Sequence, residues 1–425
     1  MYTKIILKNG LRLITIPLAH TRAVTCLVMV GAGSKYETKR TNGVAHFLEH
    51  MMFKGTKKRP SALEISSLLD GVGSDYNAMT GKEWTGYYVK VASEHLELAL
   101  DVLSDSYLNS LFVAEEIEKE RGVITEEINM YLDTPARHIG DLWEQLLYGD
   151  TPAGWTIAGE KENIATMRRE DFMEYLAAHY TAPNTHVVIA GSFNSRTIKK
   201  TVETYFAKVP NRIAGKKPKT NEVQREPQFL LHTKQTDQTH LMVGVRSYDL
   251  FSPKRYALSM LATILGGGMS SRLFTEVREK RGLAYSVHTS PEHYTDSGYF
   301  VTQAGVRKEA AGEALKVILG EYKKIAQDGL RKGELEKAKH YIEGKLLLGL
   351  ESSDEFAFFA GEQEVLTGHI RKPDEILRKI SAVRAGDVQR VARDIFRPEK
   401  LNAVLLGPFG EKEKSACEQI LGSYA

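Results

Sequence analysis

Strand-like and helix-like hydrophobic patterns alternate through the first half of the chain. Ile5–Ile16 alternates apolar and polar residues about an Asn-Gly pair, which tolerates the positive φ of a tight hairpin turn. Val24–Val30 is an apolar, β-branched run that predicts a buried strand. It ends at a glycine-rich loop, after which Gly43–Phe53 places apolar residues at helical spacing. A hairpin, a strand and a helix are therefore expected in this order.

The pattern continues with a capped helix, a second hairpin, long helices and a strand. Ser61 precedes an apolar helical run, and Glu64 follows three residues later, as in a capping box. Residues 74–91 alternate around a short polar turn, which indicates the hairpin. Three helical patterns then occupy about 96–147, before the apolar strand 185–191.

The same order of patterns recurs after a polar, proline-containing segment at 213–227, which predicts a linker. A strand, a helix and a Gly-Tyr strand repeat their first-half counterparts at 241–245, 256–265 and 297–301. We therefore expect an α+β fold of two homologous domains, each a mostly antiparallel β-sheet with helices packed on it. The expected domains are 1–212 and 228–425. Because the second-half helix has no histidines, it offers no counterpart of the chemistry described below.

Length and composition fit a globular protein of two or three domains. The chain has 425 residues, of which 42% are hydrophobic and 26% charged, close to the globular average. The formal net charge is only +3 and the two signs are interspersed, so no nucleic-acid partner is expected.

Cysteine usage and the apolar runs indicate a reducing, aqueous compartment. Only Cys26 and Cys417 are present, without a CxxC pair, which argues against a disulfide framework or a thiolate metal site. The N-terminus alternates like a strand and lacks a signal peptide's apolar core. No stretch approaches the roughly 18 uninterrupted apolar residues of a membrane-spanning helix. We expect a cytoplasmic protein with no membrane partner.

Candidate chemistry lies in the predicted helix 43–53. At about 100° per residue, His46 and His50 lie about 40° apart and Glu49 lies about 60° from His46, so all three share one face. Two imidazoles one turn apart can bind one zinc ion, while the carboxylate reaches a water molecule instead of the metal. This H-x-x-E-H order is the motif of the inverzincin class. The alternative is that the motif arose by chance. In that case the histidines lie in an apolar core with their hydrogen bonds satisfied, and the glutamate lies on a solvated face.

A zinc site of this kind needs a third protein ligand and an open fourth position. Glu115–Met130 is a carboxylate-rich helical segment. Within it, Glu120 and Glu127 are seven residues apart and lie about 20° from each other on one face. One of the two carboxylates could ligate the metal while the other supports it.

These residues and their surroundings resemble the pitrilysin-type zinc metallopeptidases, including two-domain bacterial homologues of the mitochondrial processing peptidase β subunits. The resemblance covers nearly the whole chain. It begins with His46-Phe47-Leu48-Glu49-His50 and a glutamate 77 residues after His50. Further spaced matches are Glu120-Arg121-x-Val-Ile-x-Glu126-Glu127-Ile128-x-Met130-x-x-Asp133-x-Pro135 and Tyr180-x-Ala182-x-Asn184.

The resemblance implies a role for each candidate in the first domain. The implied ligands of one Zn²⁺ per chain are His46, His50 and Glu127. Glu49 would be the general base, and Glu120 a supporting carboxylate near the metal. The adjacent Glu126 is disfavoured by the family spacing and by the face that Glu127 shares with Glu120.

The resemblance also implies a substrate site. Asn77 and Ala78 match an edge strand that binds an extended peptide by β-augmentation, although an ordinary edge strand would read the same. Arg278 and Tyr285 match a pair that the family uses near the scissile carbonyl, so they would assist catalysis and bind substrate. The preceding glycines 266–268 resemble the family's glycine-rich loop and lack the Gly-Lys-Ser/Thr signature of a phosphate cradle. The metal-free domain would thus contribute to substrate binding.

The implied function is that of a zinc-dependent endopeptidase acting on peptides or unfolded protein segments. Family enzymes enclose substrate in a chamber of four homologous domains, whereas this chain supplies two, so a homodimer is expected. The sequence does not separate a processing peptidase from a peptide scavenger. The alternative from another class is a non-catalytic scaffold or binding subunit, because some relatives in the family have lost ligands.

Overall fold

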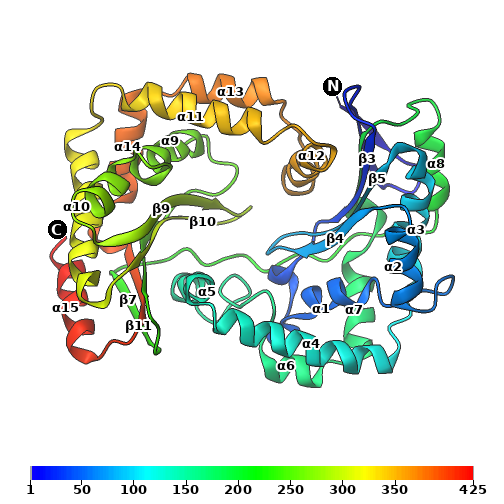
Figure 1. Ribbon diagram of the computed structural model, residues 1–425, viewed down its shortest axis with the longest axis horizontal. Helices are drawn as coiled ribbons and strands as arrows, with labels where there is room; N and C mark the ends of the chain where they lie inside the picture. Colours follow the sequence, from blue (N-terminus) through cyan, green and yellow to red (C-terminus); the bar gives the residue numbers. More distant parts are fainter. Residues whose placement is uncertain (1, 425) are drawn as a thin grey trace. The chain divides into compact units, whose positions relative to one another are not determined.

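The computed structural model describes residues 2–424, which divide into two compact units. Unit 1 consists of the residues up to Asn129, Trp155–Pro218 and Leu348–Ile370. Unit 2 consists of Met130–Gly154, Lys219–Leu347 and the residues from Arg371 onwards. Each unit contains one β-sheet with helices packed against it (Figure 1). The predicted α+β fold with mostly antiparallel sheets is confirmed.

Unit 1 contains a six-stranded sheet in the order β1-β2-β6-β3-β5-β4. Its strands are β1 (Thr3–Ile6), β2 (Arg12–Pro17), β3 (Ala23–Val30), β4 (Asp75–Thr80), β5 (Thr85–Ala92) and β6 (Thr185–Gly191). The β2–β6 pair is parallel and the other pairs are antiparallel. The predicted first hairpin forms around Gly10, whose φ is 93°. β4 is the outermost strand, so one of its edges has no neighbour in the sheet.

The helices of unit 1 lie on both faces of this sheet. They are α1 (Val44–Met51), α2 (Ala62–Asp70), α3 (Leu96–Asn109), most of α4 (Ala114–Leu132), α6 (Lys161–Thr166), α7 (Arg169–His179), α8 (Ile198–Tyr205) and α12 (Ser353–Thr367). In Figure 1, α12 covers one face of the sheet and α3 the opposite one. The alternation along β3 explains this, since Leu27 and Met29 pack against Ala357 and Ala360 of α12.

Unit 2 repeats the strand order of unit 1 without a counterpart of β1. Its sheet runs β7-β11-β8-β10-β9 and again has one parallel pair, β7 with β11. The strands are β7 (Gln228–Thr233), β8 (Thr239–Arg246), β9 (Ala284–His293), β10 (Gly298–Val306) and β11 (Leu401–Gly407). The internal repeat predicted from the sequence is therefore visible in the topology of the two sheets.

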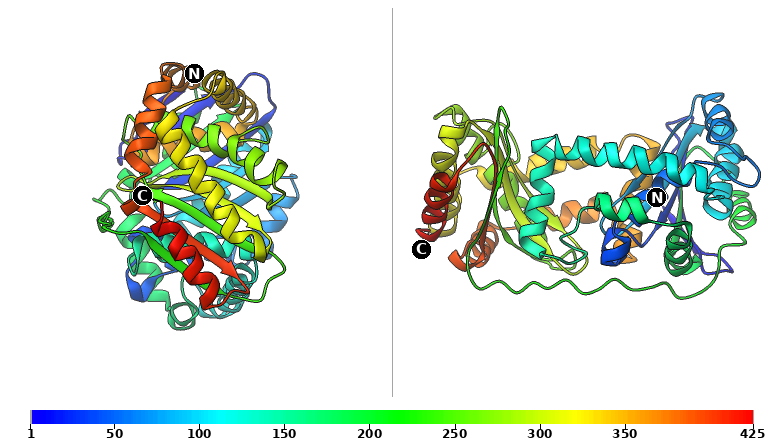
Figure 2. Two further views of the ribbon diagram at one scale, coloured as in Figure 1. Left: turned by 90° about the vertical axis from the view of Figure 1, so that its left-hand side faces the viewer. Right: turned by 90° about the horizontal axis from the view of Figure 1, so that it is seen from below.

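The helices of unit 2 also cover both faces of their sheet. They are α5 (Pro135–Tyr148), α9 (Arg255–Gly266), α10 (Ala311–Asp328), α11 (Glu334–Leu348), α13 (Pro373–Ser381), α14 (Ala385–Ile395) and α15 (Glu411–Gly422). α5 lies on one face and α10 on the other, as the right-hand view of Figure 2 shows. Within residues 2–424, no helix has both the length and the apolar character needed to cross a bilayer.

The two units exchange one helix each, so they are not the contiguous halves expected from the sequence. α5 belongs to the first half of the chain but packs Ile139 and Trp143 against the sheet of unit 2. α12 belongs to the second half but joins unit 1, where the buried Glu364 lies 2.5 Å from Lys4 Nζ. The chain also passes from unit 1 to unit 2 after Pro218, within the predicted linker, which forms no helix or strand.

Two buried histidines of unit 1 predict that acid destabilises the fold. Burial lowers the pKa of His179 to about 4 and that of His186 to about 3. Both rings are therefore neutral in the folded chain, whereas the unfolded chain protonates them below about pH 6.5. Their contribution to stability is fully present above that pH and is lost as the pH falls towards 4. Urea titrations between pH 7 and 4 should show each ring contributing a loss of roughly 3 kcal/mol in the free energy of unfolding.

A His179→Gln variant gives the control, because it removes one titrating ring and leaves the carboxylates in place. Its free energy of unfolding should depend less steeply on pH than that of the wild type over this range. Identical pH dependence of the two proteins would contradict the assignment of a neutral buried ring to His179.

Candidate metal and active site

Helix α1 carries the H-x-x-E-H motif, and its start is fixed by a glycine and a buried carboxylate. Gly43 has a φ of 99°, and a Cβ there would lie 2.8 Å from the carbonyl oxygen of Ala158, so only glycine fits. The Glu37 carboxylate accepts hydrogen bonds from the backbone N–H groups of Gly43 and Ala45, both at 2.9 Å. It also accepts one from Asn42 Nδ2 at 3.0 Å. These bonds satisfy free N–H groups of the first turn and place a carboxylate at the positive end of the helix dipole.

The apolar face of α1 anchors the helix and leaves the motif on the other side. Phe47 and Leu48 are fully buried, and the Phe47 ring packs edge-on against Phe172 at a centroid distance of 4.8 Å. The imidazole rings of His46 and His50 lie next to each other, 4.8 Å between centroids. The structure therefore brings the two histidines together as the helical spacing predicts.

Helix α4 brings Glu127 to both imidazoles. Glu127 Oε2 lies 3.1 Å from His50 Nε2 and 3.5 Å from His46 Nε2. One ligand atom from each of the three residues falls within 4.8 Å of the others, which makes the group able to hold a metal ion. A tetrahedral zinc ion with bonds of about 2.0–2.1 Å separates its ligand atoms by about 3.3–3.4 Å. The donor types and these spacings fit such an ion.

Glu120 lies two turns before Glu127 on α4 and contacts Nδ1, the second ring nitrogen of His50. Its Oε2 is 3.1 Å from His50 Nδ1, and its Oε1 is 2.5 Å from Lys54 Nζ. Burial lowers the pKa of His50, but the hydrogen bonds and charges of Glu120 and Glu127 outweigh it and raise the pKa to about 9. A carboxylate on the far nitrogen is the usual partner of a metal-binding histidine and fixes the ring. Glu120 is thus placed to orient His50.

Glu49 lies on the same side of α1 and is held by a strand. Thr80 Oγ1, at the end of β4, donates a hydrogen bond to Glu49 Oε2 at 2.6 Å. Burial raises the pKa of Glu49, and the charge of Glu127 adds to this, while Thr80 and His50 oppose it. A raised pKa makes a carboxylate a stronger base.

The competing carboxylate of Glu126 points elsewhere. Its side chain is exposed, and it is absent from the group of residues that could hold a metal within the described part of the chain. Helical periodicity alone accounts for this, because neighbouring residues are about 100° apart around the axis.

The predicted substrate residues of the first domain lie on the outermost strand. Asn77 and Ala78 are in β4, which pairs with β5 on one side only. The Asn77 side chain is exposed, and its Oδ1 accepts a hydrogen bond from the Ala78 N–H at 2.8 Å. β4 has the open edge that β-augmentation requires, although an added strand would have to displace the Asn77 side chain to bond the Ala78 N–H.

Arg278 and Tyr285 lie together in unit 2. Arg278 Nη1 donates to the Tyr285 carbonyl at 2.7 Å, and the guanidinium lies 5.0 Å from the Tyr285 ring centroid. The Tyr285 side chain is exposed at 74%, so its hydroxyl is free to meet a ligand. The structure brings this pair together, in a unit separate from the histidines.

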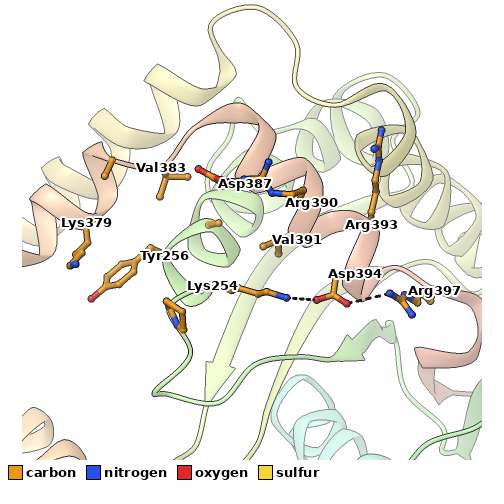
Figure 3. Close-up of a pocket in the computed structure, with 13 residues that line it drawn as sticks. Lys254, Tyr256, Lys379, Val383, Asp387, Arg390, Val391, Arg393, Asp394 and Arg397 are labelled. Atoms are coloured by element: carbon orange, nitrogen blue, oxygen red, sulfur yellow. Dashed lines mark hydrogen bonds and ion pairs between the residues drawn. The ribbon is translucent and has the colours of Figure 1, made fainter.

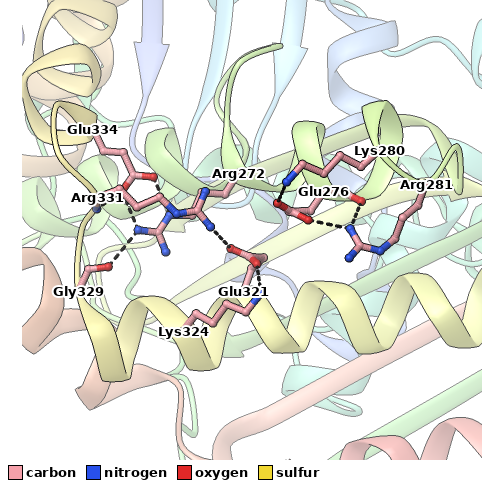
Figure 4. Close-up of polar contacts among 9 residues, drawn as sticks. All are labelled: Arg272, Glu276, Lys280, Arg281, Glu321, Lys324, Gly329, Arg331 and Glu334. Atoms are coloured by element: carbon pink, nitrogen blue, oxygen red, sulfur yellow. Dashed lines mark hydrogen bonds and ion pairs between the residues drawn. The ribbon is translucent and has the colours of Figure 1, made fainter.

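Arg278 belongs to a single π-helical segment, Phe274–Glu279, that ion pairs hold at both ends (Figure 4). Glu276 accepts hydrogen bonds from Lys280 and Arg281, each at 2.7 Å. On the other side, Arg272 pairs with Glu334 at 2.6 Å. Segments of π-helix occur often at functional sites, and here the segment carries one of the residues predicted to bind substrate.

Three residues that the sequence did not single out support the site: Glu37, Lys54 and Thr80. Lys54 follows His50 by four residues, so helical spacing could have indicated that it shares the motif's side of the chain. Thr80 follows Ala78 by two residues and so shares its face of the strand. Glu37 lies in a loop without periodicity, and no pattern connects it with α1.

A cavity in unit 2 is separate from these residues (Figure 3). It has a volume of about 690 Å³ and lies along α9, α13 and α14. Some of its charged groups are paired with each other: Asp394 lies 2.8 Å from Lys254 and 3.5 Å from Arg397. None of the predicted site residues lines it, so its size is no argument for placing chemistry there.

The neighbouring glutamates of α4 allow a matched test of metal binding. Glu127→Gln should weaken zinc binding by at least about 100-fold, because the amide brings no negative charge to the cluster. Glu126→Gln changes an exposed carboxylate of the same helix and should bind zinc like the wild type. Zinc per chain, measured by mass spectrometry after dialysis against a metal buffer, checks both. Equal zinc retention by the two variants would show that Glu127 is no ligand.

Comparison with protein families gives two adjacent matches. Residues 12–161 match the family described as Insulinase (Peptidase family M16), and residues 166–342 match the Peptidase M16 inactive domain. The first match contains the histidine motif and Glu127. The second contains Arg278 and Tyr285.

Individual proteins show the same relationship over nearly the whole chain. Uncharacterized zinc protease YmxG of Bacillus subtilis is 36% identical over 403 residues, covering 95% of this chain and 97% of the relative. Uncharacterized zinc protease SCO5738 of Streptomyces coelicolor is 35% identical over 420 residues, covering 96% and 90%.

Solved structures show the same fold. A protease from Helicobacter pylori superposes with a TM-score of 0.90 at 24% identity, covering 96% of this chain and 99% of that one. The peptidase M16 inactive domain from Pseudomonas fluorescens gives 0.88 at 20% identity, covering 96% and 98%. With a fold of this kind, two adjacent family matches and relatives identical at more than one position in three, this chain belongs to peptidase family M16, the pitrilysin-type zinc metallopeptidases.

Proposed function

We propose that this chain is a zinc-dependent endopeptidase that hydrolyses peptides or unfolded protein segments. The observation that carries the proposal is the position of Glu127 Oε2 between the Nε2 atoms of His46 and His50. Glu49 stands on the same helix face as the histidines, where a general base is needed. The names of the bacterial relatives, which call them zinc proteases, support the choice of metal and of reaction.

The residues of the site divide the chemistry among them. Zinc held by His46, His50 and Glu127 would supply a Lewis acid that lowers the pKa of water towards about 7. Glu49 takes the proton of the attacking water as the water oxygen bonds to the peptide carbonyl carbon. Glu49 then passes this proton to the leaving amine nitrogen as the C–N bond breaks, which restores the carboxylate.

The substrate is an extended peptide that joins the sheet of unit 1 at β4. Backbone groups of Asn77 and Ala78 on the free edge of the strand would pair with the peptide backbone. Recognition of this kind depends on main-chain hydrogen bonds and tolerates many side chains. It requires an unfolded segment, so we expect folded proteins to be poor substrates.

The active form we propose is a homodimer in which each site uses residues of both copies. Arg278 and Tyr285 of one copy would donate hydrogen bonds to the oxyanion that develops at a carbonyl bound near the zinc ligands of the other copy. The exposure of Tyr285 and its contact with the Arg278 guanidinium support such a role. The composite arrangement comes from the family resemblance.

Replacing the base separates catalysis from metal binding. Glu49→Gln should retain the zinc content of the wild type, because Glu49 is no ligand, and should lower kcat by about 10²- to 10⁴-fold, because the amide accepts no proton. Cleavage of an unstructured, internally quenched peptide gives the rate. Activity equal to that of the wild type would refute the mechanism. A zinc-loaded wild type that cleaves no peptide in a diverse library would instead favour the scaffold or binding subunit.

Mixed dimers test whether the sites are shared between copies. Glu49→Gln and Tyr285→Phe chains should each be impaired alone, whereas a dimer of one of each contains one site with both native residues. An equal mixture should therefore recover about a quarter of the wild-type activity once exchange is complete. Mass-labelled chains verify the exchange. Full exchange without recovery would place Glu49 and Tyr285 of a working site in one chain.

A further inference from the structure

Thr80 joins the proposed base to the proposed substrate strand. Its Oγ1 donates to Glu49 Oε2 at 2.6 Å, and Thr80 is the one hydrogen-bond partner of the Glu49 carboxylate among residues 2–424. Nothing in the motif spacing assigns a role to this residue. The contact is notable because Thr80 ends β4, two residues after Ala78.

The backbone at Thr80 is held rigidly. Thr80 pairs with Thr85 of β5, and Thr85 Oγ1 donates to the Ala32 carbonyl at 2.9 Å. The turn that follows is clamped to the preceding loop, because Ser34 N–H donates to the Gly81 carbonyl at 3.2 Å. At Gly33 a Cβ would lie 2.1 Å from that carbonyl oxygen, so the two segments are in the closest contact that a glycine permits. A hydroxyl on this backbone has a defined position.

A buried ion pair adds to this clamp. Lys35 Nζ lies 3.0 Å from Glu83 Oε1, and both side chains are at most 4% exposed. The same loop continues to Glu37, which caps the first turn of α1. The strand end that holds Thr80 and the helix that carries Glu49 are thus fixed to one another by several contacts.

We propose that Thr80 is a positioning residue, whose hydroxyl holds the Glu49 carboxylate in the orientation needed to take a proton and couples it to the strand that binds substrate. The proposal rests on the proposed function. With Oε2 engaged by Thr80, Oε1 is the oxygen left for water. A glutamate side chain has several rotatable bonds, and the β-branched threonine has a restricted χ1, so the bond transfers the rigidity of the strand to the base. The position of Glu49 is then fixed relative to a peptide that is paired with β4.

The alternative is that Thr80 only staples the strand to α1. Its Oγ1 also lies 3.5 Å from the Ala45 carbonyl oxygen, a much weaker contact than the one to Glu49. A stapling role would predict that losing the hydroxyl loosens the fold, the metal site or the substrate strand. A positioning role predicts that only the chemical step suffers.

The test compares Thr80→Val, which keeps the shape and removes the hydroxyl, with Thr80→Ser, which keeps the hydroxyl. Both are assayed as zinc-loaded full chains with an unstructured, internally quenched peptide, beside the wild type and Glu49→Gln. We expect Thr80→Val to lower kcat by about 10- to 100-fold while KM, zinc content and Tm stay close to wild type. Thr80→Ser should keep kcat within about threefold. Crystal structures should show the Glu49 side chain moved in the Val variant and unmoved in the Ser variant.

The outcomes separate this inference from the function on which it rests. If the wild type cleaves and Glu49→Gln does not, but Thr80→Val keeps its kcat or its Glu49 orientation, the positioning role is wrong and the peptidase stands. If Thr80→Val loses zinc or raises KM in proportion to the lost activity, Thr80 is structural and the inference is overturned. If Glu49→Gln cleaves as well as the wild type, the proposed mechanism fails and takes the role of Thr80 with it.

Discussion

The carboxylate of Glu120 joins the two helices on which the candidate site is built. It is 4% exposed and contacts His50 at the end of α1 and Lys54 just beyond it. Hydrogen bonds between charged groups such as these are shorter and stronger than bonds between neutral groups. α4 therefore keeps one register against α1, and Glu127, two turns further on, is held opposite the histidines. The distances within the metal group therefore depend in part on this contact.

Helical periodicity was enough to predict the centre of the site. His46, Glu49 and His50 needed only an angle of about 100° per residue to be placed on one face. The same angle separates Glu126 from Glu127, and the structure turns Glu126 to solvent. The residues that support these groups could not be predicted in this way. Glu37 binds backbone N–H groups from a loop, and Thr80 reaches a helix from a strand, so each depends on tertiary contacts that no local pattern records.

The repeated strands were predictable from their alternating and apolar patterns, but the sheet that each covering helix packs on was not. α5 has one apolar face, whereas the apolar residues of α12 are spread around the helix, and both sheets offer buried apolar residues for a helix to cover. Hydrophobic pattern alone fits either pairing. The exchange is fixed by specific contacts, such as Thr25 with Ser353 at 2.8 Å and Glu364 with Lys4. Elements that follow one another in the sequence usually lie side by side, but α5 and α12 each join the other unit.

The exchanged α12 imposes an order on biosynthesis. All six strands of unit 1 have been made once the ribosome has passed Gly191, yet the helix that covers Leu27, Met29 and Val188 ends at Thr367. At roughly 5–20 residues per second, the delay is roughly 10 to 35 s. Throughout that interval the nascent chain displays an apolar sheet face that its own sequence will later cover. A transiently exposed apolar surface of this kind favours aggregation, so the helix exchange leaves unit 1 vulnerable until the second half of the chain is nearly complete.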